Sequence, residues 1–508
     1  MQSIEIKVSP KEAEEIDIVK LKVLAVYGKQ AYVRIDKKSL DARSKFPFYT
    51  VRATVFDTES EAKLVPPYQA QDVSKAREIH IIGAGPAGLF AALECIQAGL
   101  KPVIIERGKA VKERRRDLAI LNKDLIVNPD SNYCFGEGGA GTYSDGKLYT
   151  RSKKRGDVLR VLEAFVQFGA AHNILYDSKP HIGTNKLPGI ITQMRDFIEE
   201  CGGEVHFDTR LEDIDIKDGS ITKLVCNGGV SMPCKELILA TGHSARDIFE
   251  LLYRKGVDIE AKPFALGVRI EHPQEMINQM QYRQANPEYL PSAYYNIVEQ
   301  VNGAGVFSFC MCPGGIIASS ATNAGEVVVN GWSPSKRNGK FANSGFVTQV
   351  GEEDFRPFSE KGPLSGMAFQ AHWEQQCFAA EKSIVAPAQR MEDFISGKTS
   401  STLPECSYIP GVAAHNLFDF LPQRVGQNLS DALKVIGKSK PWYRSNEAIM
   451  VATESRTSSP VRIPRTEDYH HPQIKNLYPC AEGAGYAGGI LSAALDGINC
   501  LKAIPNEK

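Results

Sequence analysis

The sequence predicts an α/β fold in which one parallel-sheet domain is assembled from two distant segments of the chain. The segment 79–108 (IHIIGAGPAGLFAALECIQAGLKPVIIERG) has the pattern of a buried strand, a glycine-rich turn, a helix and a second strand. Near the end of the chain, 477–497 (LYPCAEGAGYAGGILSAALDG) again has the pattern of a strand, a glycine-rich turn and a helix. Strands that alternate with helices in this way favour a parallel sheet.

The remaining segments complete a four-part organisation. Strand-like stretches around a Ser-Pro helix start predict a small α+β domain over 1–72. The parallel-sheet domain is expected over 73–244 and again over 471–508. Between these parts, 245–470 is rich in strands and then in helices, which predicts an inserted mixed α+β domain that covers the site and binds the substrate.

Composition excludes several classes of protein. The 508 residues are 43% hydrophobic and 24% charged, and 60 Lys+Arg balance 60 Asp+Glu, so no overall charge favours nucleic acid or an anionic membrane. The apolar run at 79–108 contains Glu94 and Lys101 and is interrupted by glycine and proline, unlike a membrane span. With no secretory signal and eleven scattered cysteines, reduced thiols in a cytoplasmic protein are expected.

The first glycine-rich turn matches G-x-G-x-x-G at Gly83, Gly85 and Gly88. Gly83 suits a tight turn, Gly85 a close approach of the backbone to a pyrophosphate, and Gly88 close packing of the helix on the strand. Pro86 fits the first helical turn, where its missing N–H is not needed. The free N–H groups and the positive end of the helix dipole would then face the phosphates. The alternative is a purely structural glycine turn.

The second strand ends at Glu106, where a carboxylate can accept hydrogen bonds from the ribose hydroxyls of an adenosine. An acidic side chain at this position disfavours a 2′-phosphate, so tightly held NADP is not expected here.

The C-terminal segment decides between dinucleotides. It resembles the closing motif of flavoproteins of the glutathione-reductase type, in which an acid binds a ribityl hydroxyl of FAD and a helix N-terminus faces the flavin. Glu482 stands where that family usually has Asp, one methylene shorter. KELILATG resembles the same family's A-T-G element at Ala240, Thr241 and Gly242. No second fingerprint occurs in mid-chain, so FAD is the expected cofactor and NADH or NADPH would bind only transiently.

Longer motifs are similar to those of a family of uncharacterised bacterial FAD-dependent dehydrogenases. They are NYCFGEGGAGTYSDGKL (132–148), FALGVRIEHPQ (264–274), SFCMCPGG (308–315), VVVNGWS (327–333) and ESRTSSPVRI (454–463). The resemblance implies the fold and the cofactor but no substrate.

Together these patterns predict a set of FAD contacts. The glycine-dense loop at 132–148 is expected to approach the ligand, and a flexible loop is the alternative. In the Arg-rich stretch 109–119 a solvated helix face is favoured, with Arg115 as the side chain that could meet the phosphates. The predicted FAD contacts are Gly83, Gly85, Pro86, Ala87, Gly88, Glu106, Arg107, Arg115, Gly139, Gly141, Ser144, Lys147, Leu211, Ala240, Thr241, Gly242, Glu482, Gly483, Gly488, Gly489 and Ile490.

Candidates for the chemistry are fewer. His243 and His272 are candidate general bases, and Arg456, Arg462 and Arg269 candidate cations on the substrate side, each with a structural role as the alternative. Cys310 and Cys312 would share one face of a strand. Packing is the favoured interpretation of this pair, because the spacing suits a disulfide poorly, and an electron-shuttling dithiol is the alternative. No cysteine and histidine set completes a zinc site, so no metal is expected.

The sequence therefore predicts an FAD-dependent oxidoreductase that transfers hydride between a small-molecule substrate and bound FAD. The alternative is a non-catalytic FAD-containing sensor or RNA-associated protein that uses its N-terminal domain for interaction. The basic tract KKSLDARSK (37–45) is the support for that alternative, and nucleic acid is otherwise not an expected partner.

Overall fold

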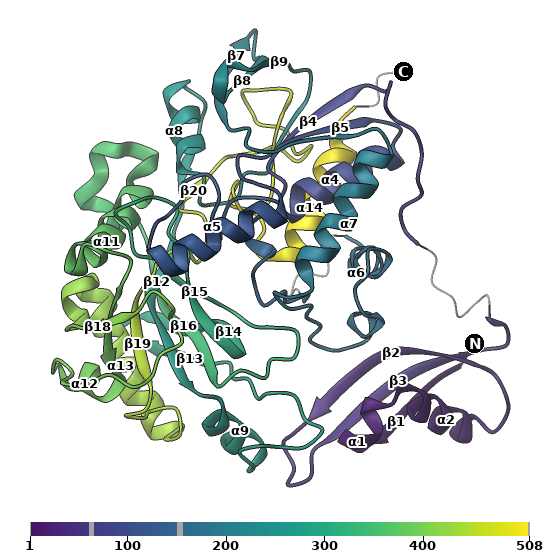
Figure 1. The fold of residues 1–508 in the computed structure, drawn as a ribbon, viewed down its shortest axis with the longest axis vertical. Coiled ribbons are helices and arrows are strands. Elements are labelled where there is room, and N and C mark those ends of the chain that lie inside the picture. Colours follow the sequence, from purple (N-terminus) through teal and green to yellow (C-terminus); the bar gives the residue numbers. More distant parts are fainter. Residues whose placement is uncertain (1, 60–65, 150–155, 506–508) are drawn as a thin grey trace.

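The computed structural model describes residues 2–59, 66–149 and 156–505 of the chain. Figure 1 shows a small N-terminal unit beside a larger body, in which a helix-covered parallel sheet and a long, mostly antiparallel sheet meet. Among the described residues, no helix is long and apolar enough to cross a membrane.

The N-terminal unit is a three-stranded antiparallel sheet with two helices. The sheet has the order β1-β3-β2, from β1 (Gln2–Val8), β2 (Tyr32–Asp41) and β3 (Phe48–Phe56), and the helices are α1 (Pro10–Glu14) and α2 (Ile16–Tyr27). The predicted Ser-Pro start of α1 is a capping box, in which Ser9 and Glu12 satisfy each other's backbone N–H. The unit contacts the larger body through Lys38, which pairs with Asp177 at 3.2 Å.

The parallel sheet has the order β21-β10-β4-β5-β6. Its strands are β4 (Glu78–Ile82), β5 (Lys101–Ile105), β6 (Glu204–His206), β10 (Leu237–Leu239) and β21 (Leu477–Pro479). Because β21 comes from the end of the chain and pairs with β10, the predicted assembly of one sheet from two distant segments is confirmed.

Helices from both segments cover this sheet. They are α4 (Pro86–Gln97), α5 (Val111–Asp124), α6 (Val158–Gln167), α7 (Leu187–Glu200) and α14 (Ile490–Ala503), and Figure 1 shows α4, α7 and α14 side by side. A Cβ on Gly497 of α14 would lie 2.1 Å from the carbonyl oxygen of Ala87, so α14 and α4 touch backbone to backbone. This contact fixes the C-terminal helix against the first turn of α4.

Two smaller sheets and one helix lie outside the parallel sheet. They comprise β7 (Leu211–Lys217), β8 (Ser220–Cys226), β9 (Ser231–Pro233), α8 (Arg246–Arg254), β11 (Glu260–Ala261) and β20 (Val461–Arg462).

The inserted segment forms an eight-stranded sheet in the order β13-β14-β16-β12-β19-β17-β18, with β15 paired to β14. The strands are β12 (Phe264–Pro273), β13 (Val298–Val301), β14 (Ala304–Ser319), β15 (Val329–Trp332), β16 (Phe341–Val350), β17 (Ala386–Arg390), β18 (Val412–Ala414) and β19 (Ile449–Glu454). The helices are α9 (Gln274–Tyr282), α10 (Glu352–Phe355), α11 (Ser365–Glu381), α12 (Met391–Ser396) and α13 (Gln423–Ser439).

Side chains of α11, α12 and α13 share one apolar core with this sheet, on the side away from the parallel sheet (Figure 1). The segment 387–397 (PAQRMEDFISG) is half strand and half helix, because Ala386–Arg390 pairs with β19 and Met391–Ser396 is helical. The mixed α/β class is confirmed, and the domain boundaries at 72, 244 and 470 stay a prediction.

Candidate FAD site

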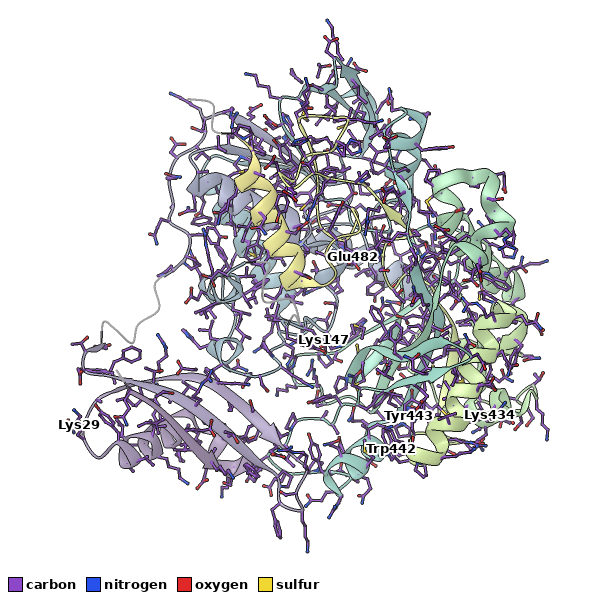
Figure 2. The ribbon with its side chains drawn as sticks, turned by 180° about the vertical axis from the view of Figure 1, so that it is seen from behind. Lys29, Lys147, Lys434, Trp442, Tyr443 and Glu482 are labelled. Carbon is purple, nitrogen blue, oxygen red and sulfur yellow. The ribbon has the colours of Figure 1, made fainter. Side chains whose placement is uncertain are left out.

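The carboxyl ends of the parallel strands meet at one cavity of about 290 Å³. Gly83 follows β4, Glu106 follows β5, Ala240 follows β10, and Glu482 lies just beyond β21. This is the edge at which open parallel α/β sheets bind their ligands. Figure 2 shows Lys147 and Glu482 between α14 and the strands of the eight-stranded sheet.

Most of the predicted contact residues line this cavity. They are Gly83, Gly85, Pro86, Ala87, Glu106, Arg107, Gly139, Gly141, Ser144, Lys147, Leu211, Ala240, Thr241, Gly242, Glu482, Gly489 and Ile490, together with the candidate base His243.

Glycine stands at the three fingerprint positions for different structural reasons. Gly83 has φ +104° and a Cβ there would lie 2.5 Å from the Ala240 carbonyl oxygen, so the turn itself requires glycine. A Cβ on Gly88 would lie 1.9 Å from the Gly83 carbonyl oxygen, so Gly88 serves helix packing and does not line the cavity. At Gly85 the nearest heavy atom to a Cβ is 3.9 Å away and φ is −75°. The protein itself therefore leaves room for a side chain at Gly85.

Glu106 is buried, and backbone N–H groups hold its carboxylate. Its Oε2 accepts a hydrogen bond from Ala84 N at 2.8 Å, and its Oε1 accepts from Gly108 N and Gly136 N, each at 2.9 Å. A carboxylate has about four acceptor sites, so one remains for a ligand hydroxyl. Glu106 thus also ties the fingerprint turn to the loop that begins near 132.

Arg114 and Arg115 differ in burial, and neither lines the cavity. Arg114 is fully buried and donates to the carbonyl oxygens of Asn132 (2.8 Å), Glu137 (2.8 Å) and Gly139 (2.9 Å). Arg115 is exposed and is absent from the cavity wall. The favoured interpretation of the triplet as a solvated face is therefore corrected for Arg114, which holds the glycine-rich loop in place.

That loop brings its glycines against the fingerprint turn. A Cβ on Gly139 would lie 3.1 Å from the Gly85 Cα, so the two glycine-rich segments are in contact beside the cavity. Ser144 Oγ donates to Gly141 O at 2.7 Å and accepts from Gly146 N at 3.0 Å, so Ser144 forms the turn that precedes Lys147.

Lys147 lies at the end of the cavity that faces β14. Its Nζ donates to the Met311 carbonyl oxygen and lies 3.6 Å from Cys310 Sγ and 3.8 Å from Asp145 Oδ2. Asp145 is also bound by Arg337, whose Nε is 3.0 Å away. Cys310 itself lines the cavity.

Glu482 and His243 face each other across 3.9 Å. Burial raises the pKa of Glu482 to about 7, partly offset by Lys262. Burial, reinforced by the charges of Arg456, Lys262 and Arg246, lowers the pKa of His243 to about 3. His243 is therefore neutral at neutral pH, and its low basicity disfavours it as the general base.

Several other predicted residues are not brought to the cavity. His272 is fully buried and hydrogen-bonds to the Tyr443 carbonyl oxygen at 2.8 Å, and burial lowers its pKa to about 4. Arg456 is buried between Glu374 and Glu326, and Arg269 is buried against Glu454. These positions correct the substrate-side placement of all three side chains, because each is buried in the protein and none lines the cavity.

Three more predicted residues do not line the cavity. A Cβ on Gly483 would lie 2.7 Å from the Gly242 carbonyl oxygen, so Gly483 serves backbone packing. Gly488 is exposed beside Glu482, outside the cavity wall. Arg462 is exposed and pairs with Glu260 at 3.7 Å, and it does not line the cavity either.

Sequence reasoning missed part of the wall. Thr209, Arg210, Asp247 and Phe135 also line the cavity. The segment after β6 supplies Thr209 and Arg210, and its position at the carboxyl end of a parallel strand was the available signal.

One group of metal-ligand type occurs among the described residues. Cys480, Asp496 and Cys500 lie together and are buried. Asp496 is already bound by both terminal nitrogens of Arg465, each at 2.8 Å, and by the backbone N–H of Ala481. The arginine therefore occupies the place of a cation in this cluster.

The site defines the class of protein. Residues 78–113 match the model of an FAD binding domain, and residues 263–457 match a model described as "FAD-dependent protein, C-terminal domain-like". FAD is thus the cofactor, and since the chemistry of FAD is oxidation and reduction, the protein is an FAD-dependent oxidoreductase.

The chain belongs to the same family as an uncharacterized protein of Clostridium beijerinckii, to which it is 40% identical over 502 residues, covering 94% of this chain and 93% of that protein. The solved structures that the chain matches are more distant. Glycine oxidase from Bacillus cereus is 12% identical over 84% of this chain and 94% of its own, with a TM-score of 0.31. A variant of the E. coli quinol fumarate reductase subunit FrdA is 14% identical over 84% of this chain and 70% of its own, with a TM-score of 0.34.

Proposed function

We propose that FAD lies along this cavity with its pyrophosphate at the first turn of α4. The proposal rests on the surroundings of Gly85. It lines the cavity, its φ suits any residue, and the protein leaves space for a Cβ there. The close approach of a ligand explains why glycine stands at such a position.

The other residues follow from their places on the wall. Backbone N–H groups and the dipole of α4 would meet the phosphates, with the contacting loop at Gly139 opposite them. Glu106 would use its remaining acceptor site for a ribose hydroxyl of the adenosine. Glu482, which lines the cavity, would accept a hydrogen bond from the ribityl chain.

The substrate end of the cavity is proposed to lie at Lys147 and Cys310. FAD supplies an acceptor or donor of hydride when bound. A small molecule would enter beside Lys147, whose ammonium group orients an electronegative substrate atom. His243, neutral at the working pH, would act through hydrogen bonding and not as the base.

We further propose a transient nicotinamide as the external electron partner and a reducing, cytoplasmic location. The eleven cysteines are all free thiols, which supports such a location. The interaction-protein alternative has less support, because the basic tract at 37–45 is partly neutralised. Lys38 pairs with Asp177 and Arg43 pairs with Asp41.

The test is spectroscopic. Purified protein should be yellow or become so with added FAD, and its flavin should bleach anaerobically with NADH or NADPH. Bleaching by one of the two nucleotides would identify the preferred donor. A bound flavin that neither nucleotide reduces, together with salt-sensitive RNA binding, would favour the interaction protein instead.

A further inference from the structure

Cys310 has an unusual backbone at the wall of the proposed FAD cavity. It lies within β14, at the point where the register against β16 shifts between Phe309 and Cys312. Its φ is +49°, in the left-handed region that a residue with a Cβ seldom adopts. Such strain persists where the surrounding structure imposes it, and it concentrates at functional sites. The irregular backbone leaves the Cys310 side chain exposed at the cavity.

Positive charge surrounds this thiol. Lys147 Nζ is 3.6 Å from Cys310 Sγ, and Arg269 Nη2 donates to the Cys310 carbonyl oxygen at 2.9 Å. A hydrogen bond from Cys312, followed by the charges of Lys147 and Arg269, lowers the pKa of Cys310 well below that of an ordinary thiol. The Lys147 ammonium group beside Cys310 therefore favours the thiolate, the reactive form of cysteine, at the cavity.

Cys312 is the protonated partner. It is fully buried, and its thiol donates a hydrogen bond to the Cys310 carbonyl oxygen at 3.3 Å. Its pKa is raised, because it serves as the donor to the neighbouring thiolate and is buried. A low-pKa thiolate in contact with a second thiol is the arrangement that thiol–disulfide exchange requires.

We propose that Cys310 and Cys312 are a redox-active dithiol that exchanges two electrons with the flavin. This inference rests on the proposed function, which puts FAD in the same cavity. In the oxidising direction the Cys310 thiolate and the Cys312 thiol together lose two electrons and one proton, and one S–S bond forms. The flavin gains the electron pair and that proton and becomes fully reduced, as its anion. In the reverse direction the reduced flavin breaks the S–S bond. A disulfide across a single intervening residue is strained, so this couple is easily reduced.

The decisive experiment counts electrons in the holoenzyme. The protein is treated with a thiol oxidant, desalted, and titrated anaerobically with dithionite while the flavin absorbance is followed. Wild type should consume four electrons per flavin, two for the flavin and two for the disulfide. Cys312→Ser should consume two. The matched control is Cys406→Ser, at a partly buried cysteine outside the cavity wall, and it should keep the count of four.

Chemical labelling gives a readout that does not depend on turnover. Peptide mass spectrometry should find the 310–312 pair linked after oxidation and free after dithionite. At a pH below the pKa of Cys310, Lys147→Met should slow alkylation of Cys310 about tenfold, as expected if the thiol pKa rises by about one unit.

The outcomes separate the two proposals. A yellow wild-type protein that consumes only two electrons, or a Cys312→Ser variant that still consumes four, overturns the dithiol and leaves the FAD site intact. A protein that stays colourless with excess FAD overturns both.

Discussion

Replacing Gly85 with alanine should separate cofactor binding from folding. The backbone at Gly85 is compatible with alanine, and the added Cβ would meet no protein atom closer than 3.9 Å. The free energy of unfolding of the apoprotein should therefore change by less than about 1 kcal/mol, the usual effect of alanine for glycine at a helix start. The new methyl group would stand in the cavity, between the first turn of α4 and Gly139.

Displacing the pyrophosphate from one charge-assisted hydrogen bond should weaken FAD binding by about 1.5–3 kcal/mol. That corresponds to about a ten- to hundredfold higher Kd. Flavin fluorescence quenching measures the Kd and urea denaturation the stability. The control is Gly189→Ala in α7, where a Cβ meets nothing within 4 Å. It should stabilise the helix by up to about 1 kcal/mol and leave the Kd unchanged. Equal Kd values for both variants would refute the assignment of Gly85 to the pyrophosphate.

Three further changes test the surroundings. Glu106→Gln should weaken FAD binding about tenfold and lower the melting temperature, because the amide NH₂ would oppose the backbone N–H donors now facing the carboxylate; calorimetry with and without FAD measures both. Arg114→Met should lower the free energy of unfolding of the apoprotein by about 3 kcal/mol or more, measured in urea, because three buried carbonyl groups lose a charged donor. Arg115→Met should change it by less than about 0.5 kcal/mol. Loss of FAD from the Arg115 variant would restore Arg115 as a phosphate contact. Because the pKa of Glu482 is raised, its contribution to apoprotein stability is fully present below about pH 4.5 and is lost as the pH rises through about 7. Glu482→Gln should therefore be more stable than wild type above pH 7. Parallel curves of stability against pH for the two proteins would contradict the raised pKa.

The sequence pattern predicted those parts of the site whose structure depends on neighbouring residues. A strand, a glycine turn and a helix are specified by neighbouring residues, so both glycine-rich segments and Glu106 could be placed before the structure was seen. Arg114 could not be told from Arg115 in the same way. Both stand in one run of three arginines, and the carbonyl groups that bind Arg114 come from the loop near 132–139.

Long-range pairing also explains the errors in the inserted segment. Strict alternation along SFCMC predicts two equivalent cysteines on one strand face. The register shift between Phe309 and Cys312 instead exposes Cys310 and buries Cys312. A register shift depends on the partner strand, β16, whose sequence lies about thirty residues away. Arg456 lies away from its predicted place beside the substrate for a related reason. Glu374 and Glu326, which bind it, approach it only once the sheet and α11 have formed.

The pairing of charges restricts what the cavity can bind. Arg107 is held by Asp130 and Asp247, and Arg210 is held by the same Asp130 and by Glu212. These cations of the cavity wall are thus largely neutralised before any ligand arrives. The phosphates of FAD would then be met mainly by backbone N–H groups and the dipole of α4, which are fixed in place and need no reorganisation. A highly charged substrate would find little compensation at such a wall. We therefore expect a weakly charged substrate that is recognised by shape at the end where Lys147 meets Cys310.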